Sequence, residues 1–234
     1  MKLAHPERRL APGAFWREVD EEHNRYVAER LPGQSILDVG CGYGTLTDHL
    51  SRLGKKVVGI DQDPESVRVA RSRNLAGEIV EGRFEGRFAS GSFDHVVLRD
   101  VLHHLYAEGD LSASLAEIRR VLKCDGTLVV LDPNVHFLLR LCRRLMAHRD
   151  AECPLEDARA ALERAGFEIR EVQFYELFAL AASGGYVGIC WVPPIRRLHR
   201  ALIALNRRLS SGIARTRMAR SLLWRYRLVA APRA

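Results

Sequence analysis

The chain of 234 residues lacks the patterns of a metal-binding or secreted protein. Its five cysteines are spread along the chain without a C-x-x-C pair or a histidine cluster at ligand spacing, which excludes a typical structural zinc site and favours a reducing compartment. The segment from Met1 to Arg9 has no apolar h-region, so a cleaved secretory signal is not expected. We therefore expect a cytoplasmic protein without a bound metal.

Acidic residues are absent after Glu176, where the chain carries 11 arginines and no lysine. The rest of the chain carries 25 Lys and Arg residues against 29 Asp and Glu residues. The net charge of +7 therefore comes from the C-terminal segment alone. This asymmetry predicts a near-neutral core and a basic partner surface after Glu176.

An uncharged stretch lies between Glu176 and Arg196 but does not have the pattern of a membrane span. Glycines at 184, 185 and 188 and the pair Pro193-Pro194 interrupt it, so a stable spanning helix is not expected. The pattern favours burial against the core or a lid over an apolar substrate.

The most informative segment runs from Ile36 to Gly44, where four strand-like residues lead into glycines at 40, 42 and 44. The helix-like stretch Thr45 to Leu53 follows. Glycine reaches positive φ angles and leaves room for a ligand beside the backbone. The segment therefore predicts a strand, a cofactor loop and a helix.

A second short strand, Lys56 to Ile60, ends in Asp61, 21 residues after Gly40. In a βαβ unit of this length the acid lies at the tip of the second strand, within reach of a ribose. The order of strand, glycines, helix, strand and acid indicates a nucleotide-like cofactor.

The glycine spacing is G-x-G-x-G preceded by Asp38, whereas a dinucleotide fingerprint is G-x-G-x-x-G. Together with Ser92 to Val97, Leu102 to Leu105 and Glu117 to Leu128, it resembles the class I methyltransferases that bind S-adenosylmethionine (SAM). The resemblance covers residues 35 to 134. It implies SAM as cofactor and methyl transfer as activity.

The same resemblance implies an α/β fold, a Rossmann-like, seven-stranded, mostly parallel sheet with helices on both faces. We expect one methyltransferase domain over residues 1–234, with a helical cap over 12–32 and a helical insertion over 177–221 as a substrate lid. Further expected elements are helices at 15–31, 64–73, 112–122, 137–146 and 154–165, and strands at 78–81, 94–98, 127–131, 167–176 and 224–231. The family's turn after the fourth strand corresponds to Leu102–Leu105.

The resemblance assigns a set of candidate cofactor residues. The glycines would line SAM, Asp38 would support the loop, Asp61 would hold the ribose, and Gln62 would flank the adenine. The backbone around Arg83 and Phe84, or Glu85, would contact the adenine amine, since arginine cannot accept a hydrogen bond. The complete set is Asp38, Gly40, Cys41, Gly42, Gly44, Asp61, Gln62, Arg83, Phe84 and Arg99, with the Arg99 backbone near the methionyl group.

Histidines supply the candidate catalytic base. His103 and His104 follow the fourth strand, and His136 and Asp132 follow the fifth. A histidine near neutral pKa suits proton removal from an acceptor, although alignment alone can drive methyl transfer and this pair can equally be structural. No magnesium is expected, because the His-His pair lacks the hard oxygen ligand of related Glu-His sites.

The segment Ile195 to Leu209 predicts a basic amphipathic helix, with apolar residues at steps of three and four. Its leucines could insert into an anionic membrane interface or pack on the core with the arginines in water. The sequence thus predicts methylation of a small, apolar or lipid-linked acceptor. The alternatives are a non-catalytic membrane or partner adaptor and a methyltransferase for RNA or another anionic substrate.

Overall fold

The computed structural model describes residues 10, 11, 13–109, 111–137, 140, 151–184 and 190–233. Most of the expected helix 137–146 lies outside these residues. The chain divides into two compact units. The sheet unit comprises Tyr26–Asp132, Ala151–Val172 and Arg227–Ala234, and the helical unit comprises Met1–Arg25, Pro133–Asp150 and Gln173–Tyr226.

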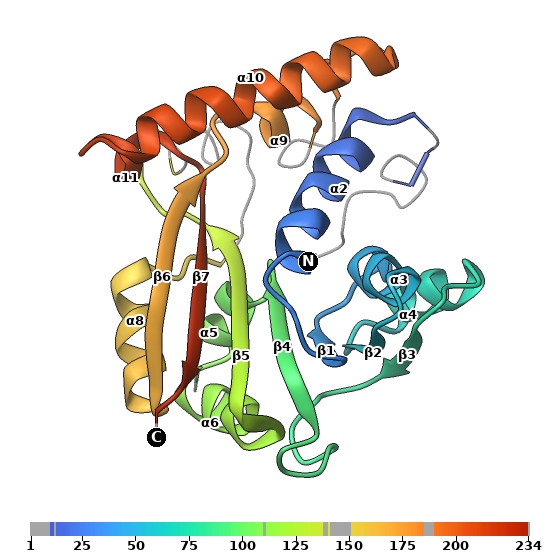
Figure 1. The fold of residues 1–234 in the computed structure, drawn as a ribbon, viewed down its shortest axis with the longest axis vertical. Coiled ribbons are helices and arrows are strands. Elements are labelled where there is room, and N and C mark those ends of the chain that lie inside the picture. Colours follow the sequence, from blue (N-terminus) through green and yellow to red (C-terminus); the bar gives the residue numbers. More distant parts are fainter. Residues whose placement is uncertain are drawn as a thin grey trace. The chain divides into compact units, whose positions relative to one another are not determined.

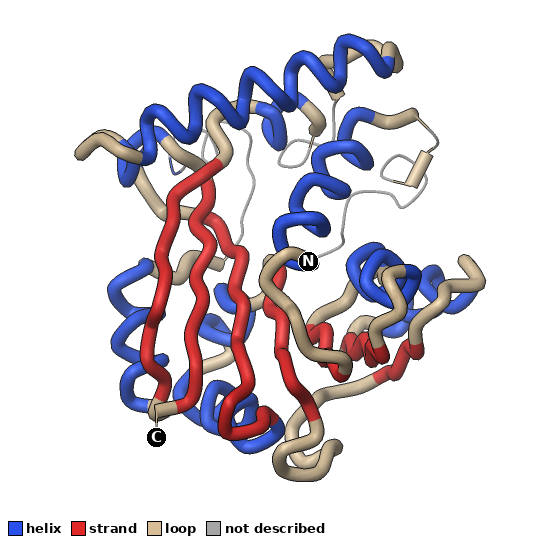
Figure 2. Tube along the Cα trace, viewed as in Figure 1, coloured by secondary structure: helices blue, strands red, loops and turns tan. Residues whose placement is uncertain are grey.

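A seven-stranded sheet has the strand order β3-β2-β1-β4-β5-β7-β6 (Figures 1 and 2). The bounds are β1 Ser35–Val39, β2 Lys56–Asp61, β3 Glu78–Glu81, β4 Phe93–Arg99, β5 Leu122–Pro133, β6 Phe167–Tyr175 and β7 Arg225–Pro232. The pairs β1–β2, β1–β4, β2–β3 and β4–β5 are parallel. The chain therefore winds from β1 towards β3 in one direction and towards β5 in the other.

Helices connect the parallel strands. They are α3 Thr45–Arg52, α4 Pro64–Ser72, α5 Leu102–Ala107, α6 Leu111–Val121 and α8 Leu155–Arg164. Because right-handed crossovers in opposite directions place their helices on opposite faces, α3 and α4 cover one face and α5, α6 and α8 the other. The two-sided cover explains why the central residues of these strands are buried and apolar, namely Ile36 and Leu37 in β1, Val96 to Leu98 in β4 and Leu128 to Leu131 in β5.

Strand β7 runs antiparallel to β6. The amide of Arg233, just after β7, donates to the carbonyl of Gly166, just before β6, at 2.8 Å. The amide of Trp224, just before β7, donates to the carbonyl of Glu176, just after β6, at 2.8 Å. The predicted α/β fold with a mixed seven-stranded sheet is thus confirmed.

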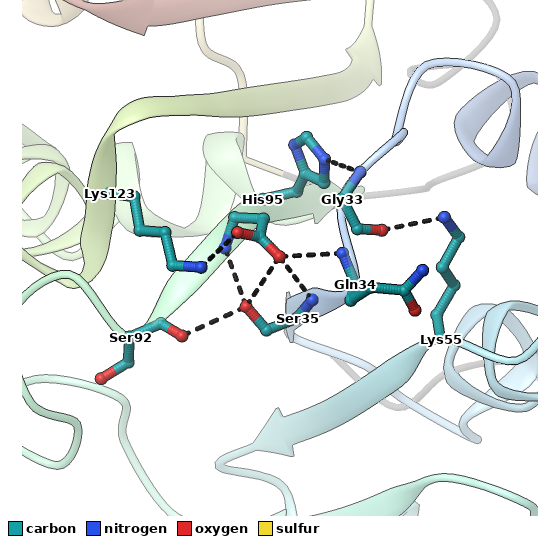
Figure 3. A network of polar contacts seen from close by, with 8 residues as sticks. Gly33, Gln34, Ser35, Lys55, Ser92, His95 and Lys123 are labelled. Carbon is teal, nitrogen blue, oxygen red and sulfur yellow. Dashed lines mark hydrogen bonds and ion pairs between the residues drawn. The ribbon is translucent and has the colours of Figure 1, made fainter.

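A polar network joins the beginnings of β1 and β4 (Figure 3). Asp94 Oδ2 accepts hydrogen bonds from the amides of Gln34 and Ser35, each at 2.8 Å, and Lys123 Nζ lies beside Asp94 Oδ1. His95 Nε2 accepts from the amide of Gly33 at 2.8 Å. These bonds satisfy the donors that precede β1, at the end of the strand opposite the glycine loop.

The helical unit contains α9 Ala179–Ala182, α10 Arg196–Ala214, α11 Ala219–Leu222 and most of α2 Phe15–Ala28. Its apolar cluster consists of Phe15, Val19, Ala179 and Leu180, with Leu202 and Ile203 of α10 packed against it. Asn206 Oδ1 accepts from three amides that begin the α9 turn, at 3.0 to 3.3 Å, those of Leu177, Phe178 and Ala179. An inserted helical substructure before β7 is therefore present, as predicted.

Three local predictions need correction. The expected turn Leu102–Leu105 is the helix α5, because the amides of His104 and Leu105 both donate to the carbonyl of Val101. Helix α2 ends at Ala28, before the predicted Leu31, and α10 continues to Ala214, beyond the predicted Leu209. Within the described residues, no helix is long and apolar enough to cross a membrane.

Candidate functional site

The glycine loop leaves β1 through three left-handed residues, with φ of 67° at Gly40, 53° at Gly42 and 70° at Gly44. The amides of Gly40 and Cys41 both donate to the carbonyl of Ile60, at 2.8 and 3.1 Å. Gly44 is the N-cap of α3 and makes no side-chain cap. The loop is therefore held by its own backbone against the end of β2.

Two of these glycines are also required by packing. A Cβ at Gly40 would lie 2.2 Å from Val101 Cγ2, and a Cβ at Gly44 would lie 2.3 Å from Leu75 Cδ1. The sequence interpretation attributed both glycines to ligand access. The structure adds that the sheet unit cannot close around a side chain at either position.

Asp61 at the end of β2 organises the loop. Its Oδ2 accepts from the amide of Gly42 at 2.7 Å, and its Oδ1 accepts from the amide of Asp63 at 2.9 Å. A carboxylate offers about four lone-pair directions, so each oxygen retains capacity for a further donor. Asp61 is thus oriented by backbone donors and able to accept hydroxyl groups.

Asp38 is buried beneath the loop. Thr47 of α3 donates to Asp38 Oδ2 at 2.7 Å. Burial raises the pKa of Asp38 from 3.8 to about 6, although the Arg99 guanidinium partly opposes the shift. Arg99 Nη2 also donates to Thr45 Oγ1 at 2.8 Å. The Asp38 and Arg99 side chains therefore stabilise the junction of β1 and α3 through their hydrogen bonds to Thr47 and Thr45.

Two other predicted cofactor residues are buried. Burial and the nearby carboxylates of Asp38 and Asp61 raise the pKa of the Cys41 thiol, which disfavours a reactive thiolate. The Phe84 ring is buried in the core of the sheet unit. Only the backbone of these two residues is suited to contact a ligand.

Arg83 and Gln62 meet in a surface network that the sequence did not predict. Arg83 pairs with Glu108 at 2.9 Å and with Glu85 at 3.1 Å, while Gln62 donates to Glu108 Oε1 at 2.9 Å. Glu108 directly follows α5, so the network joins the loops after β2, β3 and α5.

His103 forms a buried pair with Asp132, which combines two rival base candidates. His103 Nδ1 lies 2.9 Å from Asp132 Oδ1, and the pair joins α5 to the end of β5. An ionised carboxylate only accepts hydrogen bonds, so Nδ1 carries the proton and Nε2 is the basic atom. His104 stacks on His103 with ring centroids 4.2 Å apart.

His136 follows Asp132 by four residues and belongs to the helical unit. Its ring meets Trp224 edge-on, with centroids 6.0 Å apart, and burial lowers the pKa of the imidazole. Of the described residues, no group of three or more His, Cys, Asp or Glu side chains could hold a metal ion.

Sequence reasoning missed Val101, Thr47 and Glu108. Val101 fills the space beside Gly40, and Thr47 satisfies Asp38. Thr47 stands on the helix that directly follows the glycines, which was an available signal for a partner of Asp38. No local signal pointed to Val101 or Glu108, because their partners are distant in the sequence.

Comparison with known proteins agrees with this geometry. Residues 37–130 match the family model described as a methyltransferase domain. The ubiquinone biosynthesis O-methyltransferase of Xanthomonas campestris is 40% identical over 111 residues, which cover 44% of this chain and 45% of that protein. The human mitochondrial protein of the same name is 35% identical over 120 residues, which cover 47% of this chain and 32% of that protein. The match therefore spans less than half the length of these relatives.

A solved structure extends the likeness to nearly the whole chain. A SAM-dependent methyltransferase from Archaeoglobus fulgidus aligns with a TM-score of 0.66 over 96% of each chain, at 16% identity. At this identity the likeness shows the fold.

Proposed function

We propose that the chain is a class I S-adenosylmethionine-dependent methyltransferase that transfers the methyl group of SAM to a small, apolar or lipid-linked hydroxyl acceptor; the methyltransferase-domain match over residues 37–130 and the O-methyltransferase relatives support this. The single observation that carries the proposal is Asp61, held by the amides of Gly42 and Asp63 at the end of β2. SAM, when bound, would supply a methyl group attached to a sulfonium. The sulfonium sulfur departs as a neutral thioether, which makes it a good leaving group.

The residues of the loop fit this cofactor. Asp61 retains lone pairs for two ribose hydroxyls, and the glycine loop needs no cation because SAM has no pyrophosphate. The backbone of Gly40, Gly42 and Gly44 would lie along the cofactor, and Gln62 would flank the adenine. Asp38 and Arg99 act behind the loop, so their effect on the cofactor is indirect.

We assign His103 as the base for a hydroxyl acceptor. Asp132 holds its Nδ1, which leaves Nε2 as the atom that takes the acceptor's proton. The relatives named as O-methyltransferases support an oxygen acceptor. His104 and His136 remain unassigned, and no observation favours the adaptor or the RNA methyltransferase.

Titration calorimetry with SAM tests the cofactor assignment. We expect Asp61→Ala to weaken SAM binding by at least about tenfold, since it removes a charged acceptor, while Asp125→Ala, at an exposed position, leaves binding unchanged. No binding of SAM to folded wild-type protein would overturn the proposal.

Labelled SAM incubated with a cell lipid extract tests the transfer. His103→Gln should lower the rate of transfer by about 100-fold while SAM binding is retained, as is usual for loss of a general base. Asp132→Asn should shift the pH–rate profile, because an amide can hold the imidazole in the opposite tautomer. An unchanged rate and pH profile in both variants would limit the pair to a structural role.

A further inference from the structure

Helix α10 packs through an unexpected side. Its buried residues are His199, Asn206 and Ser210, all polar, and each lies at a step of three, four or seven from another. Figure 1 shows α10 as one long helix, and within the helical unit it contacts α2, α9 and α11. The predicted leucine stripe is therefore not the packing face, apart from Leu202.

Of the remaining apolar residues of the stripe, Leu198 is half-buried and three are exposed. The exposed fraction is 54% for Ile195, which precedes α10, 47% for Leu205 and 41% for Leu209. At about 100° per residue, Leu198, Leu205 and Leu209 lie within roughly 40° of one another, about 100° from the centre of the buried side. Helix α10 thus carries an outer apolar strip.

Two arginines flank this strip. At the same spacing, Arg197 and Arg208 lie about 80° to 100° from its centre, whereas Arg200 lies about 160° from it, on the other exposed side of the helix. Arg207 pairs with Glu22 at 3.6 Å, whereas Arg196, Arg197, Arg200 and Arg208 form no ion pair with any residue that the structure describes. Their counter-charge therefore has to come from another molecule or from solvent ions.

Other exposed apolar side chains gather in the same unit. Phe137 is 79% exposed, Trp191 is 73% exposed, and Met218 is 58% exposed. The sheet unit contributes only Leu53 and Tyr106 to the exposed large hydrophobic residues found in the described part of the chain. An apolar and cationic surface without acids is typical of interfacial helices.

We propose that α10 docks on an anionic lipid membrane, with Leu205 and Leu209 inserted among the acyl chains, Arg197 and Arg208 at the phosphates, and Arg200 adding to the positive charge of the helix. This inference goes beyond the proposed methyl transfer and does not depend on it. Nucleic acid would use the arginines but not the exposed leucines. A protein partner or a second copy of the chain would use the leucines without requiring lipid charge.

Vesicle sedimentation of the full chain tests the proposal. The vesicles contain phosphatidylcholine alone or with about one third phosphatidylglycerol, and we expect binding only to the second kind at low salt. Arg197→Gln with Arg200→Gln and Arg208→Gln should weaken this binding at least about tenfold. Leu205→Ser with Leu209→Ser should weaken it by a similar factor, because two apolar side chains no longer insert.

Matched variants in the sheet unit serve as controls. Arg52→Gln with Arg68→Gln and Arg71→Gln removes the same charge, and Leu53→Ser removes an exposed leucine. Both should sediment like the wild type, and circular dichroism verifies that every variant is folded. Equal losses in the control and test variants would overturn the proposal.

Three further outcomes would also overturn it. The first is no sedimentation of the wild-type chain. The second is a loss with the arginine variant but none with the leucine variant, which would indicate a purely electrostatic surface of the kind that binds nucleic acid. The third is a dimer in light scattering that Leu205→Ser and Leu209→Ser dissociate, with vesicle binding unchanged.

Discussion

His199 and Glu18 share a proton in the helical unit. His199 Nδ1 lies 3.0 Å from Glu18 Oε1, and Nε2 lies 2.8 Å from the carbonyl oxygen of Pro193. A carbonyl only accepts, so Nε2 carries a proton, and a second proton must lie between Nδ1 and Glu18. The buried His199 therefore joins α10 to α2 through Glu18 and to the segment before α10 through Pro193.

Glu18→Ala should lower the free energy of unfolding of the helical unit by about 1–3 kcal/mol, because it leaves Nδ1 buried without a partner. Glu18→Gln should cost less than about 1 kcal/mol, since its amide can donate to a neutral His199. Urea denaturation followed by hydrogen exchange in α10 measures both. Equal exchange in all three proteins would show that the pair does not hold the helix.

Gly40 and Val101 form a tight contact that a double-mutant cycle can resolve. Gly40→Ala should destabilise the protein by about 2–4 kcal/mol, through a left-handed alanine and a clash with Val101. Val101→Ala removes both Cγ atoms, so the double variant should regain all but about 1–2 kcal/mol. Thermal denaturation provides the four values, and purely additive effects would contradict the contact.

Asp38 should make stability fall as pH rises from about 4 to about 6. The pKa of Asp38 is about 6 in the folded state, against 3.8 for an unperturbed aspartate, so the folded state holds the proton across this window and unfolding releases it. Across this window the free energy of unfolding should fall by roughly 3 kcal/mol. Asp38→Asn should abolish this decline, because its oxygen still accepts from Thr47 and it cannot ionise.

Stability curves against pH for wild type and Asp38→Asn measure this effect by difference, which cancels the other titrating groups. The variant should be more stable than wild type above about pH 6 and nearly equal near pH 4. A constant difference across the range would show that Asp38 is not protonated in the folded state.

Asp94 should have the opposite effect on the pH dependence of stability, which should fall as pH decreases. The Lys123 ammonium and the amides of Ser35 and Gln34 hold the pKa of Asp94 well below its usual range. The ionised Asp94 carboxylate stabilises the folded protein above the pKa that Asp94 has in the unfolded state. This stabilisation is lost as pH falls through the lower pKa of the folded state. Asp94→Ala should lower the free energy of unfolding by about 2–3 kcal/mol at neutral pH, because it leaves backbone donors unpaired.

Asp94→Asn is the matched variant, because its amide oxygen still accepts from both amides while the ion pair with Lys123 is lost. It should cost about 1 kcal/mol, and thermal denaturation at several pH values compares both variants with wild type. Equal losses in the two variants would assign the effect to charge alone.

Elements with strong local patterns were predicted closely. Strand β3 has the predicted bounds, Glu78–Glu81, and β7 differs from the prediction by a single residue at each end. The glycines, Asp38 and Asp61 were found because a cofactor loop between two adjacent strands has a fixed spacing along the chain. Such features depend on neighbours in sequence, which a single chain displays directly.

Pairings between distant residues were not predictable in this way. His103 and Asp132 were named separately, and their contact arises because β4 and β5 are neighbours in the sheet. The contact of Val101 with Gly40 and the network of Glu108 with Arg83 have the same origin. Local periodicity carries no information on which loop ends meet.

The sequence by itself determined the α/β class, the SAM-type glycine loop and the amphipathic, arginine-rich character of α10, since these depend on composition and spacing along the chain. Only the tertiary structure decided which side of α10 packs. Periodicity separates apolar from charged faces, but burial of His199, Asn206 and Ser210 depends on Glu18 and the residues before α9. Because those polar partners come from distant segments, Leu205 and Leu209 face outward.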